Sequence, residues 1–157
     1  MANEFRGSAV IERPIEEVFA FLADGENDPK FSPRVLEIAK TTDGPAGAGT
    51  VYRSTVKDAG VKTQREFELT EFDPPNRIRW TERSKNLIMV PRGGYDLEPA
   101  NGGTKLTLFN EFEGHGLGKA FMPLALRSAR KGADDFAAAI KRAVEAEAPA
   151  TPPQPAT

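Results

Sequence analysis

The sequence predicts an α+β domain in which a curved antiparallel sheet of seven strands wraps around one long C-terminal helix. Segments in which apolar and polar residues alternate recur along the chain, separated by turns rich in glycine, proline and asparagine. A short helical pattern interrupts these segments near the N-terminus, and a long helical pattern follows the last of them. The expected order of elements is therefore β-α-α-β-β-β-β-β-β-α.

The first three elements are a strand, a helix and a short broken segment. Residues 4–12 alternate between apolar and polar side chains, which is typical of a strand with one buried face. Pro14 stands where a helix begins, since its missing N–H costs nothing there. The apolar residues of that helix follow at helical spacing: Ile15, Val18, Phe19 and Leu22. Two prolines prevent residues 26–33 from continuing as a long helix.

Six further strands are expected between this segment and the final helix. They span residues 34–42, 50–57, 61–72, 77–84, 87–97 and 104–113. The strongest turn sequences between them are Asp73-Pro74-Pro75-Asn76 and Asn101-Gly102-Gly103. The first turn places Leu69 opposite Trp80 and Phe67 opposite Glu82, because a turn sets the register of its hairpin.

Both turns predict that the same face of the sheet is buried. The second turn places Tyr95 and Leu97 opposite Leu108 and Leu106. The inward-facing residues are mostly apolar and include Phe67, Leu69, Ile78, Trp80, Tyr95, Leu97, Leu106 and Leu108. The outward-facing residues of the first hairpin are polar: Gln64, Glu66, Glu68, Thr70, Arg77, Arg79, Thr81 and Arg83. One face is therefore expected to be covered and the other to contact water.

The last helix is predicted over residues 117–147, with its clearest apolar stripe at Phe136, Ile140 and Val144. Pro123 predicts either a kink or the true start of this helix. A single helix cannot fill the concave side of a seven-stranded sheet, so a cavity is expected between them. Residues 1–147 form the predicted domain, and residues 148–157, which carry no charge, form a predicted disordered tail.

Composition narrows the functional classes. The net charge is −2 without a basic stripe, so we expect neither nucleic acid nor an anionic lipid surface as a partner. The absence of cysteine excludes disulfides and thiolate metal sites, and the only histidine, His115, is expected in an exposed turn. We therefore expect no metal and no cofactor. No apolar run reaches a membrane-spanning length, so no stable membrane insertion is expected, and the expected location is the cytoplasm.

Several segments together resemble the START/SRPBCC superfamily, in its bacterial polyketide cyclase/dehydrase-like branch. These segments are 9–24, beginning Ala-Val-Ile-Glu-Arg-Pro, 29–35, where Phe31 replaces the tryptophan usual in the family, 47–50, 71–78 and 121–124. The resemblance covers about residues 4–147. It implies the helix-grip (START-like) fold with an internal hydrophobic cavity, in which members bind lipids, polyketides or hormones. It supplies no catalytic motif that can be carried over to this chain.

Polar residues on the covered face are the candidates for chemistry. Arg65, Glu82 and Asn110 face inward by alternation, and Tyr95 and Tyr52 supply hydroxyl groups. Glu82 has three interpretations: a structural ion pair with Arg65, a polar anchor for a ligand, or a general acid–base. Asn110 is either a satisfied buried amide or a hydrogen-bond donor to a ligand. The candidate catalytic residues are thus Glu82, Tyr95 and Asn110.

We expect the protein to bind a small, largely apolar molecule, lipid- or polyketide-like, as a monomer or homodimer. The predicted ligand-contacting residues are Phe31, Tyr52, Arg65, Phe67, Leu69, Trp80, Glu82, Tyr95, Leu108, Asn110, Phe112 and Met122. One alternative is a cyclase or dehydratase that acts on a ligand in the same cavity, without metal or nucleotide. A second alternative is a stress-related or regulatory protein-interaction module, which an exposed apolar patch on the outer face would favour.

Overall fold

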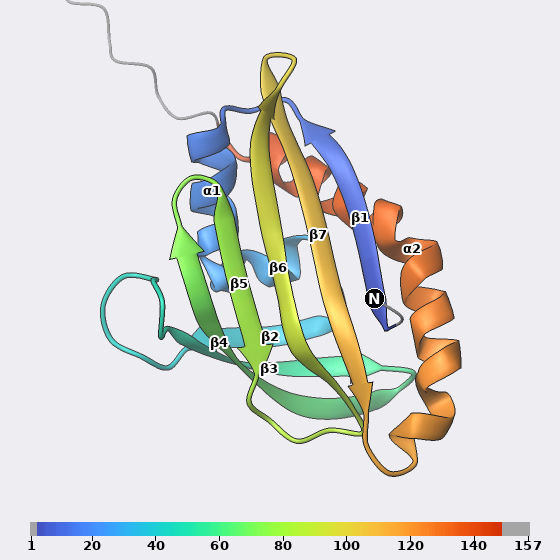
Figure 1. Ribbon diagram of the computed structural model, residues 1–157. Helices are drawn as coiled ribbons and strands as arrows, with labels where there is room; N and C mark the ends of the chain where they lie inside the picture. Colours follow the sequence, from blue (N-terminus) through green and yellow to red (C-terminus); the bar gives the residue numbers. More distant parts are fainter. Residues whose placement is uncertain (1–2, 149–157) are drawn as a thin grey trace, which may run out of the picture.

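A computed structural model describes residues 3–148 and confirms the predicted order of elements (Figure 1). These elements are β1 (Glu4–Ile11), α1 (Ile15–Ala23), the 3-10 helix η1 (Gly25–Lys30), β2 (Val35–Lys40), β3 (Val51–Asp58), β4 (Val61–Asp73), β5 (Arg77–Glu82), β6 (Ile88–Ala100), β7 (Gly103–Gly114) and α2 (Gly118–Ala146). The strands form one antiparallel seven-stranded sheet in the order β1-β7-β6-β5-β4-β3-β2. This is the helix-grip arrangement.

Both predicted registers are confirmed. Leu69 pairs with Trp80 and Phe67 with Glu82 in the β4–β5 hairpin, and Tyr95 pairs with Leu108 between β6 and β7. A bulge between Leu69 and Glu71 shifts the register by one residue closer to the turn. Bulges increase local twist, and Figure 1 shows β2 and β3 running across the direction of β6 and β7. The curvature gives the sheet the concave side on which the candidate site lies.

Helix α2 lies against β1 and β7, and a glycine permits this close approach. A Cβ atom at Gly7 would lie 2.3 Å from the backbone oxygen of Ala133, so a larger residue would push the helix off the strand. Beyond this crossing, the buried residues of α2 are Ala137, Ile140 and Val144, each at most 3% exposed. They pack with α1 and with the inner face of the sheet to form the hydrophobic core.

One prediction for the outer face is wrong. Arg79 was expected to face water, yet it is 6% exposed, and Phe109 beside it is 2% exposed. Gly94 has no side chain, so Arg79 extends across β6, and its guanidinium carbon lies 4.9 Å from the centre of the Phe109 ring. Arg6 and Arg92 approach the same ring to 5.0 and 5.2 Å. Alternation predicts the side of a sheet correctly here, but it does not predict what covers that side.

The ends of the chain test two further expectations. Helix α2 begins at Gly118, so Pro123 lies inside the helix and is not its start. The predicted tail lies, apart from Ala148, outside the described residues, and the domain boundary stays a prediction. Within residues 3–148, neither helix combines the length and hydropathy needed to cross a membrane.

Candidate functional site

Strand pairing arranges most of the predicted site residues in three rows across the inner face. The first row contains Tyr52, Phe67 and Glu82. The second contains Leu69, Trp80 and Asn110, with Gly93 between the last two, and the third contains Tyr95 and Leu108. Arg65 and Phe112 extend the site along β4 and β7, Phe31 follows η1, and Met122 lies on α2.

Glu82 is the centre of a closed polar network. Its side chain is completely buried, and Arg65 Nη1 donates to Oε1 at 2.8 Å, as the sequence predicts for a buried carboxylate. The hydroxyl of Ser84 and the amide of Asn86 both donate to Oε2 at 3.0 Å, and the backbone N–H of Val90 donates to Oε1 at 3.4 Å. A carboxylate whose two oxygens already accept four hydrogen bonds has little capacity left to accept another from a ligand. This geometry favours the structural interpretation of Glu82.

Asn110 and Trp80 meet across β6 at Gly93. The indole Nε1 of Trp80 donates to Oδ1 of Asn110 at 3.0 Å. A Cβ atom at Gly93 would lie 1.9 Å from that oxygen, so only glycine permits the contact. The amide nitrogen of Asn110 has no hydrogen-bond partner among residues 3–148. It therefore remains available to donate to a bound molecule, which is the second interpretation that the sequence leaves open.

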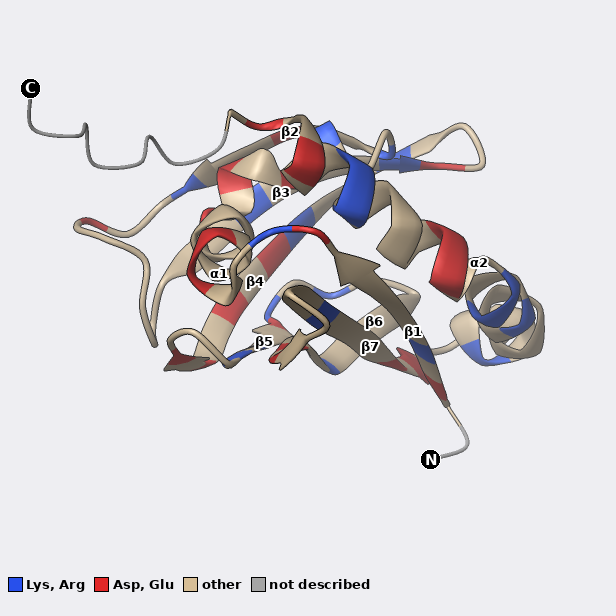
Figure 2. Ribbon diagram, turned by 90° about the horizontal axis from the view of Figure 1, so that it is seen from above, with Lys and Arg blue, Asp and Glu red and all other residues tan. Residues whose placement is uncertain are grey.

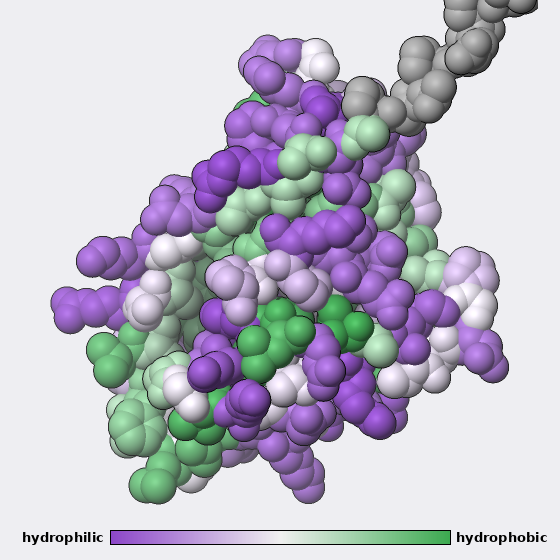
Figure 3. Space-filling model, turned by 180° about the vertical axis from the view of Figure 1, so that it is seen from behind, coloured by the Kyte–Doolittle hydropathy of each residue, from purple (hydrophilic) through white to green (hydrophobic). Residues whose placement is uncertain are grey.

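The inner face divides into a closed half and an open half. In the closed half, Phe31, Tyr52, Leu69, Tyr95 and Leu108 belong to the hydrophobic core and are at most 9% exposed. The open half consists of inward-facing residues that are only half-buried: Phe67, Trp80, Asn110 and Phe112. Trp80 packs against the edge of the core, and the ring centre of Phe112 lies 5.4 Å from that of Phe5. Figure 3, which views the concave side, shows a hollow beside α2. Large aromatic residues that face inward yet stay partly exposed show that α2 does not cover the whole inner face.

Asp28 on η1 is a polar residue that sequence reasoning missed. It is half-buried, and burial together with the negative charge of Asp24 raises its pKa from 3.8 to about 7. Burial raises the pKa of Tyr95 well above 10.0, and the charge of Asp28 adds to that rise. Burial also raises the pKa of Tyr52, whose hydroxyl donates to the Ala23 carbonyl at 3.3 Å. A carboxyl group that titrates near neutral pH is suited to proton transfer.

No pattern in the sequence distinguishes Asp28 from the other acids of its segment. It lies between Asn27 and Pro29 in a stretch that looks like a polar connection. Its surroundings arise only because η1 folds against the rest of the chain, which brings it near the tyrosines of β3 and β6. His115, by contrast, is exposed as predicted and pairs with Glu113 at 3.0 Å. In the described part of the chain, no cluster of His, Cys, Asp and Glu could hold a metal ion.

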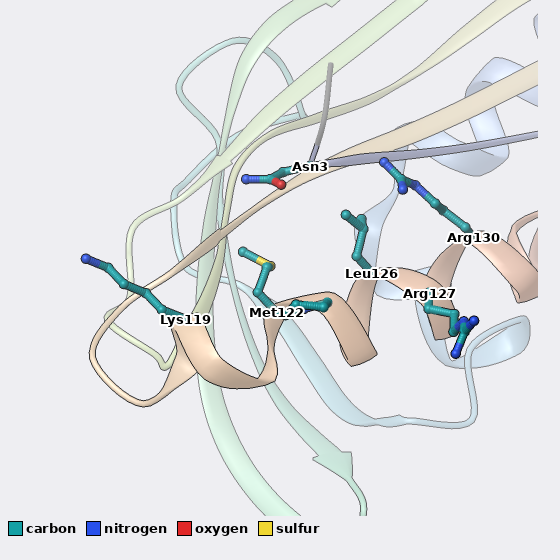
Figure 4. A pocket seen from close by; sticks show the side chains of 7 residues that line it. Asn3, Lys119, Met122, Leu126, Arg127 and Arg130 are labelled. Carbon is teal, nitrogen blue, oxygen red and sulfur yellow. The ribbon is translucent and has the colours of Figure 1, made fainter.

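A pocket of about 550 Å³ lies between the start of β1 and the first half of α2 (Figure 4). Its lining residues are Asn3, Lys119, Met122, Pro123, Leu126, Arg127 and Arg130. Met122 is the predicted site residue that this pocket contains. A second pocket of about 470 Å³ lies on the outer face, next to Arg77 and Asp96. Neither of these two pockets is lined by a predicted ligand-contacting residue from a strand, so ligand contact by those residues stays a prediction.

Solved structures share this fold at low sequence identity. The protein TTHA0849 from Thermus thermophilus matches with a TM-score of 0.76 and 21% identity, over 91% of this chain and 97% of that one. The ZhuI aromatase/cyclase from a Streptomyces species matches with a TM-score of 0.72 and 17% identity, over 90% and 93% of the two chains. The di-domain ARO/CYC BexL matches with a TM-score of 0.70 and 20% identity, over 90% of this chain and 46% of BexL. These likenesses confirm the fold.

The family comparison covers nearly the whole chain. A search of curated proteins finds no match. Residues 3–145 match the family described as polyketide cyclase/dehydrase and lipid transport, which confirms the resemblance to the START/SRPBCC superfamily. The chain belongs to this polyketide cyclase/dehydrase and lipid transport family.

Proposed function

We propose that the protein binds a small, largely apolar molecule, lipid- or polyketide-like, in the open half of its inner face. The observation that carries this proposal is the partial exposure of Phe67, Trp80 and Phe112. All three face the concave side, where their neighbours in the closed half are fully packed. An apolar ligand would cover them and gain about 25 cal/mol for each Å² of apolar surface buried, before the cost of association.

Polar groups at the edge of the open half would orient that ligand. The amide nitrogen of Asn110 can donate one hydrogen bond to a carbonyl or hydroxyl oxygen. Its orientation is held by the Trp80 hydrogen bond at Oδ1, so the nitrogen points away from the indole. Glu82 and Arg65 satisfy each other and would contribute the wall of the site. A mainly apolar surface with few polar groups is the usual composition of a small-molecule site.

The family supports this proposal in general terms. Its description names both cyclase/dehydrase proteins and lipid transport, which share an apolar molecule as substrate or cargo. ZhuI is named as an aromatase/cyclase, and its fold superposes over 90% of this chain. The likeness carries no residue role, because the identity is only 17%.

The only tryptophan of the chain, Trp80, lies in the proposed site and makes a direct test possible. We would titrate the protein with lauric acid and with a planar anthraquinone and follow Trp80 fluorescence, after native mass spectrometry of the freshly purified protein. We expect one of the two probes to change the emission saturably. Phe112→Ala removes an aromatic wall of the open half and is expected to weaken binding about tenfold, from the apolar area that is lost.

The matched control is Leu36→Ala, because Leu36 is exposed on β2, away from the proposed site. It should leave the titration unchanged. If neither probe changes the emission and no apolar molecule co-purifies, the open half is not a binding site for this class of ligand. Equal weakening by Phe112→Ala and Leu36→Ala would indicate a general effect on the fold.

Asp28 favours a second candidate function, a cyclase or dehydratase that uses this carboxyl group as proton acceptor. Its raised pKa lies where a general base works best at neutral pH, whereas Glu82 is saturated with donors. Tyr95 lies near Asp28 and presents its ring edge-on to Trp80, with 4.8 Å between ring centres. The carboxylate would remove a proton next to a carbonyl, and the cavity would hold the chain in the conformation that cyclises.

The test compares Asp28→Asn with Glu82→Gln on a substrate identified by the binding assay. We expect Asp28→Asn to abolish turnover while retaining binding, and the wild-type pH profile to rise with an apparent pKa near 7. Turnover that survives Asp28→Asn would remove Asp28 from this role. If Glu82→Gln loses turnover while Asp28→Asn retains it, Glu82 would be the proton acceptor.

The protein-interaction alternative has less support. Its condition was an exposed apolar patch on the outer face. The outer face carries ion pairs instead, such as Arg77 and Arg79 with Asp96 at 3.3 and 2.8 Å, and its large aromatic Phe109 is covered.

A further inference from the structure

The first turns of α2 carry an apolar stripe that nothing in the described chain covers. Leu117, Phe121 and Leu124 are 71%, 55% and 69% exposed. They recur at i, i+4 and i+7, so they share one side of the helix. The opposite side, with Met122 and Leu126, faces the rest of the molecule and is at most 9% exposed. Figure 3 shows this apolar surface over the start of α2, at the lower left.

Positive charge surrounds the stripe, although the whole chain carries a net charge of −2. No Asp or Glu lies between residues 114 and 133, whereas this segment contains Lys119, Arg127, Arg130 and Lys131. Figure 2 shows the start of α2 with basic residues in blue and acidic residues only farther along the helix. Within residues 3–148, Lys119, Arg127 and Lys131 take part in no ion pair. The net charge of the chain therefore does not describe the local charge around this stripe.

Charge also selects among the partners that could cover the stripe. A symmetric dimer through this surface would bring the basic residues of one copy against the same residues of the other, which is unfavourable. An acidic protein would satisfy the charges, but the three apolar side chains offer no hydrogen-bonding group for specific recognition. An anionic lipid surface matches both features, because Leu and Phe enter the acyl region while Lys and Arg remain at the headgroups.

We propose that the first turns of α2, from Leu117 to Lys131, form a docking surface for an anionic lipid membrane. Leu117, Phe121 and Leu124 insert at the interface, and Arg127 and Lys131, which flank the stripe on the helix, contact the lipid phosphates. The docking is peripheral and reversible, since the stripe is short and no helix within residues 3–148 is long and apolar enough to cross a bilayer. Lys119 and Arg127 also line the pocket between α2 and β1, so a docked molecule would place that pocket next to the membrane.

Co-sedimentation of the full chain with vesicles tests this proposal without any bound ligand. We would use vesicles of phosphatidylcholine alone and of phosphatidylcholine mixed with phosphatidylglycerol, at low and high salt. Binding is expected only to the mixed vesicles and is expected to weaken at high salt, because salt screens exposed charges. Since the test needs no ligand, its failure would leave the proposed binding function untouched, and the reverse also holds.

Three variants separate the apolar and the electrostatic contributions to vesicle binding. F121S/L124S removes exposed apolar surface and should reduce vesicle binding about tenfold or more. R127Q/K131Q should reduce it about fivefold for each charge removed. V10S/L36S is the matched control, since Val10 and Leu36 are 44% and 47% exposed elsewhere on the molecule, and it should bind like the wild type.

Four outcomes would overturn the proposal. The first is a wild-type protein that stays in solution with both kinds of vesicle, and the second is equal loss of binding in V10S/L36S and F121S/L124S. The third is a dimer, detected by light scattering, that F121S/L124S dissociates; it would assign the stripe to a second copy of the chain. The fourth is salt-sensitive retention on a polyglutamate resin without vesicle binding, which would assign the surface to an acidic protein.

Discussion

The two halves of α2 are parts of one helix with opposite surroundings. From Ala133 to Val144 the helix is pressed against β1 at Gly7 and buries a continuous stripe with α1 and the sheet. From Gly118 to Leu126 it buries only Gly118, Met122 and Leu126 and exposes Phe121 and Leu124, and Leu117 just before the helix is exposed as well. One helix therefore combines a stretch that packs into the core with a stretch whose apolar side chains face solvent. The buried stretch of α2 is held by packing, whereas Glu82 on the inner face of the sheet is held by a polar network.

The largest expected effect comes from breaking that network. Arg65→Met leaves the buried Glu82 carboxylate without its cation, which should lower the free energy of unfolding by about 3–5 kcal/mol. Urea unfolding followed by Trp80 fluorescence measures this change. The double variant Arg65→Met/Glu82→Leu removes both charges and should be less destabilised than the single variant. A double variant that is as unstable as the single one would show that the charge of Glu82 is not the cause.

Removing a packed side chain from the buried stretch of α2 should lower the free energy of unfolding. Ile140 is completely buried, so Ile140→Ala should cost about 2–5 kcal/mol, from lost apolar burial and the cavity left behind. Its matched control is Leu124→Ala on the exposed side of the same helix, which should change stability by less than about 0.5 kcal/mol. Equal effects of the two substitutions in urea unfolding would contradict the division of α2 into two surroundings.

Asp28 should make the stability of the folded protein depend on pH. Its folded pKa of about 7 exceeds the unfolded value of 3.8, so the folded state binds more protons between these values and stability falls as pH rises from about 4 to 7. Asp28→Asn removes this dependence. We expect a gain of about 2–3 kcal/mol at pH 8, allowing for partial exposure, and no gain at pH 4. Thermal unfolding of both proteins across this range measures it, and a gain that is equal at both pH values would contradict the assignment.

The smallest expected effect on stability comes from substitutions in the exposed stripe. F121S/L124S should shift the free energy of unfolding by less than about 0.5 kcal/mol, because both residues already contact water in the folded state. The same urea titration measures this shift. A larger loss of stability would mean that these side chains pack against the molecule, and the stripe would then belong to the core.

The paired strands illustrate what could be predicted from the sequence. Alternation and the turn at residues 73–76 place Leu69 opposite Trp80, and the structure agrees, because a hairpin register depends on residues close together in the chain. The same alternation fails at Arg79, which faces outward but is covered, since its burial depends on Gly94 and Phe109 from other strands. Asp28 was missed for the same reason, as its environment is built from distant segments.

Local sequence patterns are sufficient to predict the order of elements, the hairpin registers and the side chains that face inward. All three follow from periodicity, turn chemistry and steric preferences that act over a few residues. Long-range packing sets which inward-facing residues α2 covers, where Asp28 lies, and which apolar residues at the start of α2 stay uncovered. These features depend on contacts such as that between Gly7 and Ala133, which join segments far apart in the chain and have no local pattern that reveals them.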